Sequence, residues 1–132
     1  MKYLLDTDTC IYSMNEKPGI NDKLAFFSDD DLALSCFTLA ELYFGAYNSK
    51  RIDKNLQRVR SLVQPLRVLN FDNAAEQFFG SIKAELKRHG ELMNDFDLGI
   101  AAIALSNKLI LVTNNEKHFD RIPELRIENW IK

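Results

Sequence analysis

The chain has 132 residues, of which 46% are hydrophobic and 27% charged, and its formal net charge is −2. These values predict one soluble globular domain over residues 1–132. No run of consecutive apolar residues approaches the length of about 18 that a membrane-spanning helix needs, and the net charge argues against a strongly basic nucleic-acid coat protein. Because no signal-peptide pattern is present, we expect a cytoplasmic protein without a membrane partner, with Cys10 and Cys36 reduced.

Short apolar runs alternate with segments in which apolar residues recur at helical spacing. In chain order the pattern predicts a strand over 2–6, helices over 9–15 and 20–27, a strand within 31–37 that ends near Ser35, helices over 38–49 and 51–64, a strand over 66–71, helices over 73–90 and 94–107, a strand over 108–113, an irregular segment over 114–125 and a last strand over 126–130. Thr38 and Glu41 fit a capping box, and Asp72 fits a helix N-cap.

The connections between these strands are long enough to contain helices, which is typical of a parallel sheet covered on both faces. The strands that end at Asp6 and Thr113 are the most apolar, so they are expected at the centre of the sheet. The predicted fold is therefore an α/β domain, a three-layer α/β/α sandwich with a mostly parallel central sheet.

Polar residues gather where the strands of this sheet end. Asp6 follows the first strand, and Thr113 and Asn115 follow the fourth, so a parallel sheet brings them to one edge, where ligands bind in such folds. Glu41 and Asp97 lie near the starts of their helices and can reach the same edge. The sequence therefore predicts a cluster of acids there.

Three carboxylates in one pocket repel each other unless a cation or a proton joins them. Mg²⁺ or Mn²⁺ takes oxygen ligands, activates water and stabilises charge on a phosphoryl group. His89 and His118 are isolated, and neither they nor the cysteines have the spacing of a zinc site. A Mg²⁺ or Mn²⁺ site made by Asp6, Glu41 and Asp97 is the resulting hypothesis.

Several of these residues have a second interpretation. Glu41 fits a capping box equally well, and Asp95, an optional extra acid beside Asp97, fits an early-turn helix residue better. Basic residues at helical spacing could hold an RNA backbone or simply form solvated helix faces. These basic residues are Lys50, Arg51, Lys54 and Arg58 in one segment and Lys83 and Lys87 in another.

The run LLDTDT also fits the start of a haloacid-dehalogenase-type phosphatase, with Asp6 as nucleophile and Asp8 as acid/base. The strand that ends at Thr113 fits the second motif of those enzymes. They further need a lysine and a downstream acidic pair on a strand for Mg²⁺, and the residues after Thr113 contain no such pair. Glu41 and Asp97 would have no role in that scheme, so a phosphatase is the weaker hypothesis.

Taken together, LLDTDTCIY, FTLAELYFGA, NDFDLGIAAIAL and LILVTNNEKHFDRIPELRIENW resemble the PIN-domain ribonucleases of the VapC toxin type. The resemblance runs from one end of the chain to the other. It implies a PIN fold, a Mg²⁺- or Mn²⁺-dependent endoribonuclease, a homodimer and inhibition by a VapB antitoxin. The first three family acids fall on Asp6, Glu41 and Asp97, and Thr113 is implied to orient the site.

Two positions depart from the family pattern. Its fourth acid falls on Asn115, which makes a second metal ion doubtful, and its usual Asn after LDT is Asp8 here. The TNN ending and the closing RIPxLxIExW are most similar to members that cut the anticodon stem-loop of initiator tRNA. The alternative from another class is a catalytically silent PIN-fold module that only binds RNA or an antitoxin.

Overall fold

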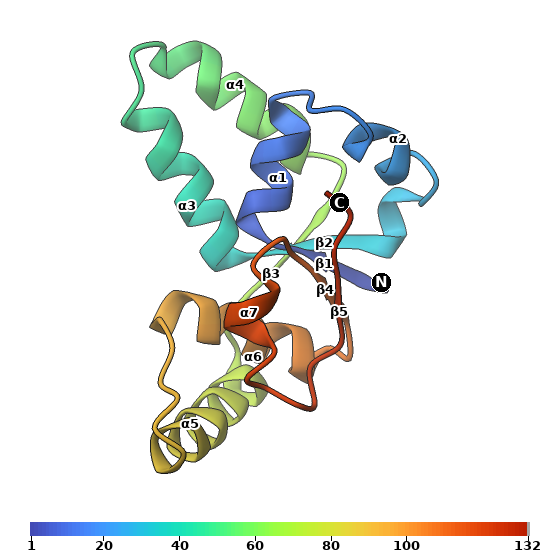
Figure 1. The fold of residues 1–132 in the computed structure, drawn as a ribbon. Helices are drawn as coiled ribbons and strands as arrows, with labels where there is room; N and C mark the ends of the chain where they lie inside the picture. The colour runs from blue at the N-terminus through green and yellow to red at the C-terminus, as the bar shows by residue number, and fades with distance from the viewer. Residues whose placement is uncertain (132) are drawn as a thin grey trace.

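The computed structural model describes residues 1–131 and has a central sheet of five strands, all paired in parallel (Figure 1). The order across the sheet is β3-β2-β1-β4-β5. The strands are β1 (Tyr3–Leu5), β2 (Leu32–Ser35), β3 (Arg67–Leu69), β4 (Ile110–Val112) and β5 (Ile127–Glu128). The sheet is thus entirely parallel where the sequence predicted it to be mostly so, and the strand that ends at Asp6 is the central one.

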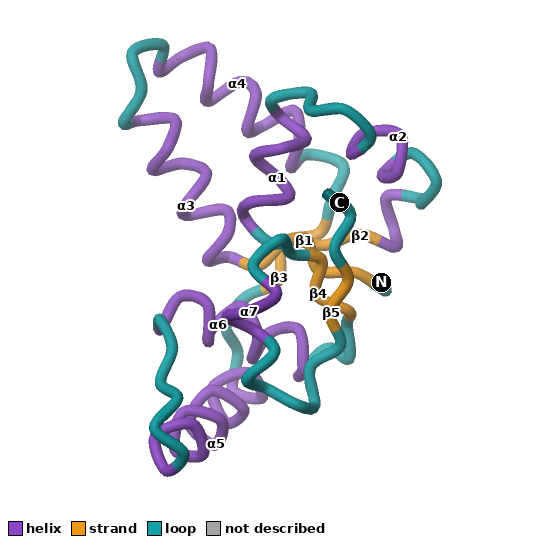
Figure 2. The backbone as a smooth tube through the Cα atoms, in the orientation of Figure 1, coloured by secondary structure: helices purple, strands orange, loops and turns teal. Residues whose placement is uncertain are grey.

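Helices cover both faces of this sheet, which confirms the predicted three-layer α/β/α fold. They are α1 (Thr7–Met14), α2 (Ile20–Leu24), α3 (Cys36–Tyr47), α4 (Ile52–Val63), α5 (Asn73–Arg88), α6 (Asp95–Ser106) and α7 (Glu116–Phe119), with a 3-10 turn at Asp29–Asp31. Figure 2 shows α1 to α4 on one side of the strands and α5 to α7 on the other. No helix within residues 1–131 is long and apolar enough to cross a membrane.

Alternating residues of each strand separate the hydrophobic core into two parts. Leu4 of β1 packs in the core made with α5 and α6, whereas Tyr3 and Leu5 pack in the core made with α1 to α4. Residues 98–104 of α6 are all buried, and three of them are alanine. These small side chains let α6 lie close against its neighbours, which brings the start of this helix near the carboxyl end of the sheet.

The chain changes direction across the sheet between β1 and β4. From β1 it proceeds to β2 and β3 on one side, and it then returns to β4 and β5 on the other. In open parallel sheets a crevice forms beyond the carboxyl ends of the two strands at such a switch point. Asp6 and Thr113 directly follow these two strands, so the topology places both at that crevice.

The predicted capping box at Thr38 and Glu41 is wrong. Helix α3 begins earlier, because the side chain of Ser35 is its N-cap and accepts a hydrogen bond from the backbone N–H of Thr38 at 3.0 Å. Glu41 is therefore free of a capping role and lies in the second turn. The short helix α7 is a second difference, since residues 114–125 were predicted to be irregular.

The last described residues are held by an aromatic cluster on the face of the sheet that α1 to α4 cover. The rings of Tyr3, Phe27 and Trp130 lie with each pair of centres 4.9 Å apart, and Trp130 stacks on Phe27 with an interplanar angle of 6°. Trp130, the single tryptophan of the chain, is buried. This cluster fixes β5 and the segment after it against β1 and the loop that follows α2.

Candidate active site

Asp6 is the most enclosed acid at the carboxyl edge of the sheet, with 3% of its surface exposed. It ends β1 and is the N-cap of α1. One carboxylate oxygen, Oδ1, accepts the backbone N–H of Thr7 at 2.8 Å, and the other, Oδ2, accepts the hydroxyl of Thr113 at 2.7 Å. Asp6 is therefore fixed between β1 and β4, as the predicted edge of the sheet requires.

The environment of Asp6 disfavours its charged form. Burial raises the pKa of this carboxyl to about 7, and the negative charges of Asp8 and Asp97 add to the increase. The hydrogen bonds from Thr113 and Thr7 act in the opposite direction but do not cancel it. A buried carboxylate that faces two further carboxylates needs a cation or a proton nearby at neutral pH.

Asp8 holds the loop that follows β4. Its Oδ2 accepts the backbone N–H of Asn114 at 3.0 Å, and the backbone N–H of Asn115 donates to the hydroxyl oxygen of Thr113 at 3.0 Å. Burial raises the pKa of the Asp8 carboxyl as well. Asp8, Thr113 and Asn115, all predicted as supporting residues, thus lie together around Asp6.

Glu41 joins the site through Thr7, a residue that the sequence analysis missed. The Thr7 hydroxyl donates to Oε1 of Glu41 at 2.8 Å and lies 3.1 Å from the hydroxyl of Thr38. Thr7 follows Asp6 directly, so one residue positions Asp6 through its backbone and Glu41 through its side chain. The sequence signal that could have identified Thr7 is its hydroxyl side chain between two acids, Asp6 and Asp8, at the first position of α1.

Asp97 lies in the first turn of α6. The Asn94 side chain caps this helix and accepts the backbone N–H of Asp97 at 3.3 Å. Its side chain is 23% exposed, and Oδ2 lies 3.5 Å from Nδ1 of His118, which comes from α7. Asp97 is near enough to raise the pKa of Asp6. His118, which is isolated in the sequence, therefore contacts a predicted site acid in the fold.

Asp95 and the predicted RNA-binding residues lie outside this cluster. Asp95 forms an exposed ion pair with Lys83 at 3.0 Å. Arg58 of α4 donates to the backbone oxygen of Met14 and lines a groove of about 210 Å³ that also contains Glu41. The remaining predicted basic residues are Lys50, Arg51 and Lys54, at and after the turn between α3 and α4, and Lys87 on α5. Because α4 and α5 lie on opposite sides of the sheet (Figure 1), the two stripes do not form one surface.

The chemistry of the donors fits a hard divalent ion. Asp6, Glu41 and Asp97 offer only oxygen atoms, and the negative charge around the buried Asp6 carboxyl is what such an ion would compensate. Within residues 1–131, no three His, Cys, Asp or Glu side chains lie close enough together to hold a metal ion as they stand. The metal site and its ligands therefore stay a prediction.

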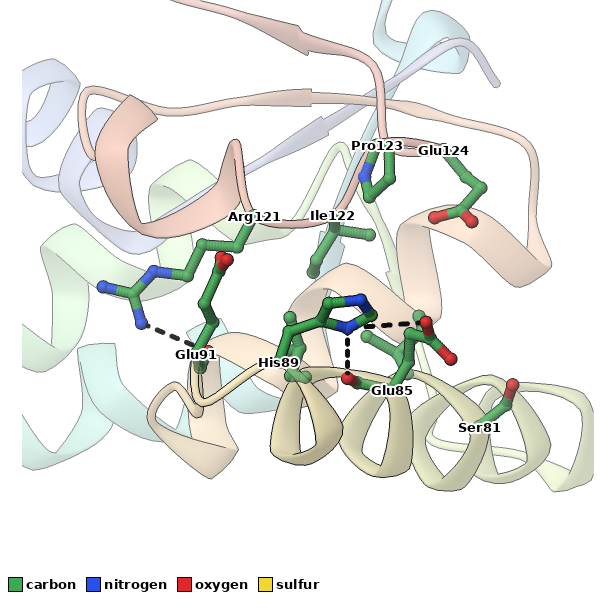
Figure 3. A pocket seen from close by; sticks show the side chains of 10 residues that line it. Ser81, Glu85, His89, Glu91, Arg121, Ile122, Pro123 and Glu124 are labelled. Carbon is green, nitrogen blue, oxygen red and sulfur yellow. Dashed lines mark hydrogen bonds and ion pairs between the residues drawn. The ribbon is translucent and has the colours of Figure 1, made fainter.

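A separate cavity of about 480 Å³ lies between α5 and the turn at 121–124 (Figure 3). In this view the His89 ring is directed at Glu85, and the Arg121 side chain reaches toward Glu91, whose backbone oxygen it approaches to 3.4 Å. Among the described residues, none of the predicted site acids lines this cavity. Its size alone does not make it the site, because the buried Asp6 and the threonines that hold Asp6 and Glu41 lie elsewhere.

Comparisons with known proteins find close relatives over the whole chain. The profile of the PIN domain matches residues 3–125. The chain is 38% identical over 130 residues to the tRNA(fMet)-specific endonuclease VapC of Salmonella typhimurium, covering 98% of each chain. It is also 38% identical over 133 residues to Ribonuclease VapC2 of Haemophilus influenzae, covering 99% of each.

Solved structures agree with these relatives. A chain in the DNA-bound VapBC complex of Salmonella typhimurium has 39% identity and a TM-score of 0.93, with 98% of both chains covered. A chain in VapBC2 of Rickettsia felis, bound to a DNA fragment from its promoter, has 33% identity and a TM-score of 0.92, with 98% of this chain and 99% of that one covered. The likeness therefore extends to the whole arrangement of strands and helices described above.

Proposed function

Since the chain belongs to the PIN-domain family and is of the VapC type, we propose that it is a metal-dependent endoribonuclease, the toxin of a VapBC-type toxin–antitoxin pair. One observation carries this proposal. At the switch point of the sheet, a buried Asp6 with a raised pKa lies beside Thr113 and is close enough to Asp97 to feel its charge. A site of this kind is suited to a divalent cation and a phosphate group.

In the proposed mechanism, Asp6, Glu41 and Asp97 would hold Mg²⁺ or Mn²⁺. When bound, such an ion lowers the pKa of water and offsets negative charge that develops on a phosphoryl group. Thr113 keeps Asp6 in one orientation through its hydroxyl, and Thr7 does the same for Glu41. The hydrogen bonds of Asp8 and Asn115 fix the loop after β4, so the acids are held before RNA arrives.

We also propose initiator tRNA as the substrate and a VapB-type antitoxin as the partner. The substrate rests on the name of the Salmonella relative, a tRNA(fMet)-specific endonuclease. The antitoxin rests on the neighbouring structures, which are VapBC complexes. We further propose a homodimer located in the cytoplasm. The family resemblance implies the homodimer, and sedimentation of the purified chain would measure it.

A second candidate is a silent PIN-fold module that binds RNA or an antitoxin without cutting RNA. The observation that favours it is Asn115, an amide at the position of the fourth family acid, which cannot contribute negative charge to a metal site. Asp8 supplies a carboxylate nearby, bonded to the adjacent residue Asn114. Because this carboxylate can supply the negative charge that Asn115 lacks, we prefer the enzyme over the silent module.

The test is cleavage of total tRNA by the purified chain in Mg²⁺, in Mn²⁺ and in EDTA. We expect defined tRNA fragments with either metal ion and none in EDTA. Sequencing the fragment ends would give the RNA and the site of cleavage. Tight RNA binding without cleavage in either metal would support the silent module and overturn the enzyme.

A further inference from the structure

Phe96 is an exposed aromatic residue directly beside the site acid Asp97. Phe96 lies in the first turn of α6, and 46% of its surface is exposed. The Asn94 side chain accepts the backbone N–H of Phe96 at 2.8 Å and that of Asp97 at 3.3 Å. The cap therefore fixes the backbone of both residues, so the exposed Phe96 ring is anchored one position from the site acid Asp97.

The Phe96 ring is held in place from behind by a row of rings. It meets Phe37 edge to face with centres 5.5 Å apart, Phe37 meets Phe71 at 5.3 Å, and Phe71 meets Phe79 at 5.7 Å. The row joins α3, which carries Glu41, to α5 and α6. Because Phe37 supports one side, the exposed part of the Phe96 ring is presented to solvent in a fixed orientation.

Gly99 fixes the middle of this row. A Cβ atom at this position would stand 2.5 Å from Cε2 of Phe37, so the ring lies against the backbone of α6. A positive charge lies at the far end, where Nζ of Lys83 is 5.7 Å from the centre of the Phe79 ring. The row thus has a half-exposed aromatic ring next to an acid of the site at one end and a cation near the other.

We propose that Phe96 is a stacking platform for an unpaired base of the RNA substrate, next to the phosphate that is cut. This inference rests on the proposed ribonuclease function and adds a residue that touches the substrate. Stacking of a base on an aromatic side chain contributes about 1–3 kcal/mol and tolerates different bases. A ring that is already ordered gains this contact at little cost in conformational entropy.

The direct test is the fluorescence of a Phe96→Trp variant, mixed by stopped flow with a single-stranded oligoribonucleotide in Mg²⁺. Stacking on the base should quench the new tryptophan before any product forms. The parent chain, whose Trp130 is buried, should show no quenching. Phe78→Trp is the matched control, because Phe78 of α5 is 41% exposed and forms no part of the row.

Equal quenching of Phe96→Trp and Phe78→Trp, or none of either, would overturn the platform. So would a change in emission that follows protein concentration and not RNA, because the ring would then be covered by a second copy of the chain. Product formation is read from the same mixtures. Quenching of Phe96→Trp without cleavage by the parent would contradict the proposed function but not the platform. Cleavage by the parent without quenching of Phe96→Trp would contradict the platform but not the function.

Steady-state cleavage gives a second readout. Phe96→Leu should raise KM by about 5- to 150-fold with little change in kcat, since about 1–3 kcal/mol of binding is removed. Phe96→Tyr keeps an aromatic face and should restore most of the loss, and Phe78→Leu should change neither constant. A Phe96→Leu variant with unchanged KM, or a Phe96→Tyr variant as weak as Phe96→Leu, would contradict base stacking.

Discussion

The hydroxyl of Thr113 donates to Oδ2 of Asp6 at 2.7 Å, which joins the ends of β1 and β4 at the point where the sheet reverses its order. Both side chains are buried. A threonine here supplies a donor that a valine of similar shape would lack, so it satisfies one oxygen of a carboxylate that water cannot reach. The bond holds the acid on which the proposed chemistry depends.

Removal of charge from the site acids should stop cleavage without unfolding the chain. For Asp6→Asn and for Asp97→Asn we expect kcat/KM to fall by about 10³-fold or more, because several kcal/mol of metal-dependent stabilisation would be lost. Cleavage assays on tRNA and a circular dichroism spectrum measure the two effects. Asp95→Asn is the matched control, since Asp95 pairs with Lys83 at the surface, and it should stay within about threefold of the parent.

The metal-free chain should lose stability as the pH rises, and Asp6 should be one cause. Its pKa is about 7 in the fold against 3.8 as the ordinary value, so the fold favours the protonated form. The resulting loss in the free energy of unfolding is small near pH 4 and grows between pH 4 and 7. Above pH 7 it reaches its full value of up to about 4 kcal/mol.

Urea unfolding in EDTA at pH 4 and pH 8 measures this effect. The free energy of unfolding of the parent minus that of Asp6→Asn should be more negative at pH 8 than at pH 4 by a few kcal/mol, whatever the variant loses in hydrogen bonds. Addition of Mg²⁺ at pH 8 should stabilise the parent more than the variant. The same difference at both pH values would show that the Asp6 carboxyl is not shifted.

Gly99 should be intolerant of any side chain. Gly99→Ala places a Cβ 2.5 Å from the Phe37 ring, and we expect it to lower the free energy of unfolding by about 1–3 kcal/mol through overpacking. Gly80→Ala is the control, because Gly80 lies within α5 with no atom within 4 Å of the added Cβ. It should be neutral or stabilise by up to about 1 kcal/mol. Thermal or urea unfolding would compare them, and equal effects would refute the close contact.

The two cysteines should differ in reactivity. Cys10 is fully buried and burial raises its pKa, whereas Cys36 is partly exposed. Iodoacetamide at pH 8 should therefore label Cys36 in the native chain and both cysteines after unfolding. Peptide mass spectrometry locates the label. Labelling of Cys10 at the rate of Cys36 in the native chain would mean that the core around α1 opens readily.

Asp8 should matter more for its oxygen than for its charge in holding the loop after β4. Asp8→Asn keeps an acceptor for the N–H of Asn114 and should leave the free energy of unfolding within about 1 kcal/mol of the parent. Asp8→Ala should cost about 1–3 kcal/mol and lower cleavage as well. Because the Asp8 carboxylate is proposed to supply charge near the metal site, Asp8→Asn should bind Mn²⁺ more weakly than the parent although its stability is unchanged. Equal Mn²⁺ binding would limit the role of Asp8 to the loop.

The fold was predictable because its signals are local and repeated. Apolar strands such as 108–113 alternate with helices in the sequence. Because Asp6 and Thr113 each follow such a strand, their positions predicted that they would meet at one edge of the sheet. The start of α3 was not predictable, because Ser35 and Thr38 are both good N-cap residues and only the packed structure selects Ser35. The four residues of α7 are too few to show a helical period.

The site was partly predictable for a similar reason. Acids at strand ends and helix starts stand out in a sequence, whereas Thr7 and His118 became visible only when the fold placed them against Glu41 and Asp97. The basic stripes show a different limit of the sequence. Lys83 matched a helical stripe, but its structural neighbours are Asp95 and the Phe79 ring, which depend on how α5 packs on α6.

The bond between Asp6 and Thr113 also sets the time at which a growing chain acquires its site. Its two residues are 107 positions apart, so synthesis makes the acid well before the hydroxyl. A ribosome that has made α6 but not β4 carries a chain whose Asp6 has no fixed place. If the chain cuts RNA as proposed, the order of its strands would thus delay activity until β4 has been made.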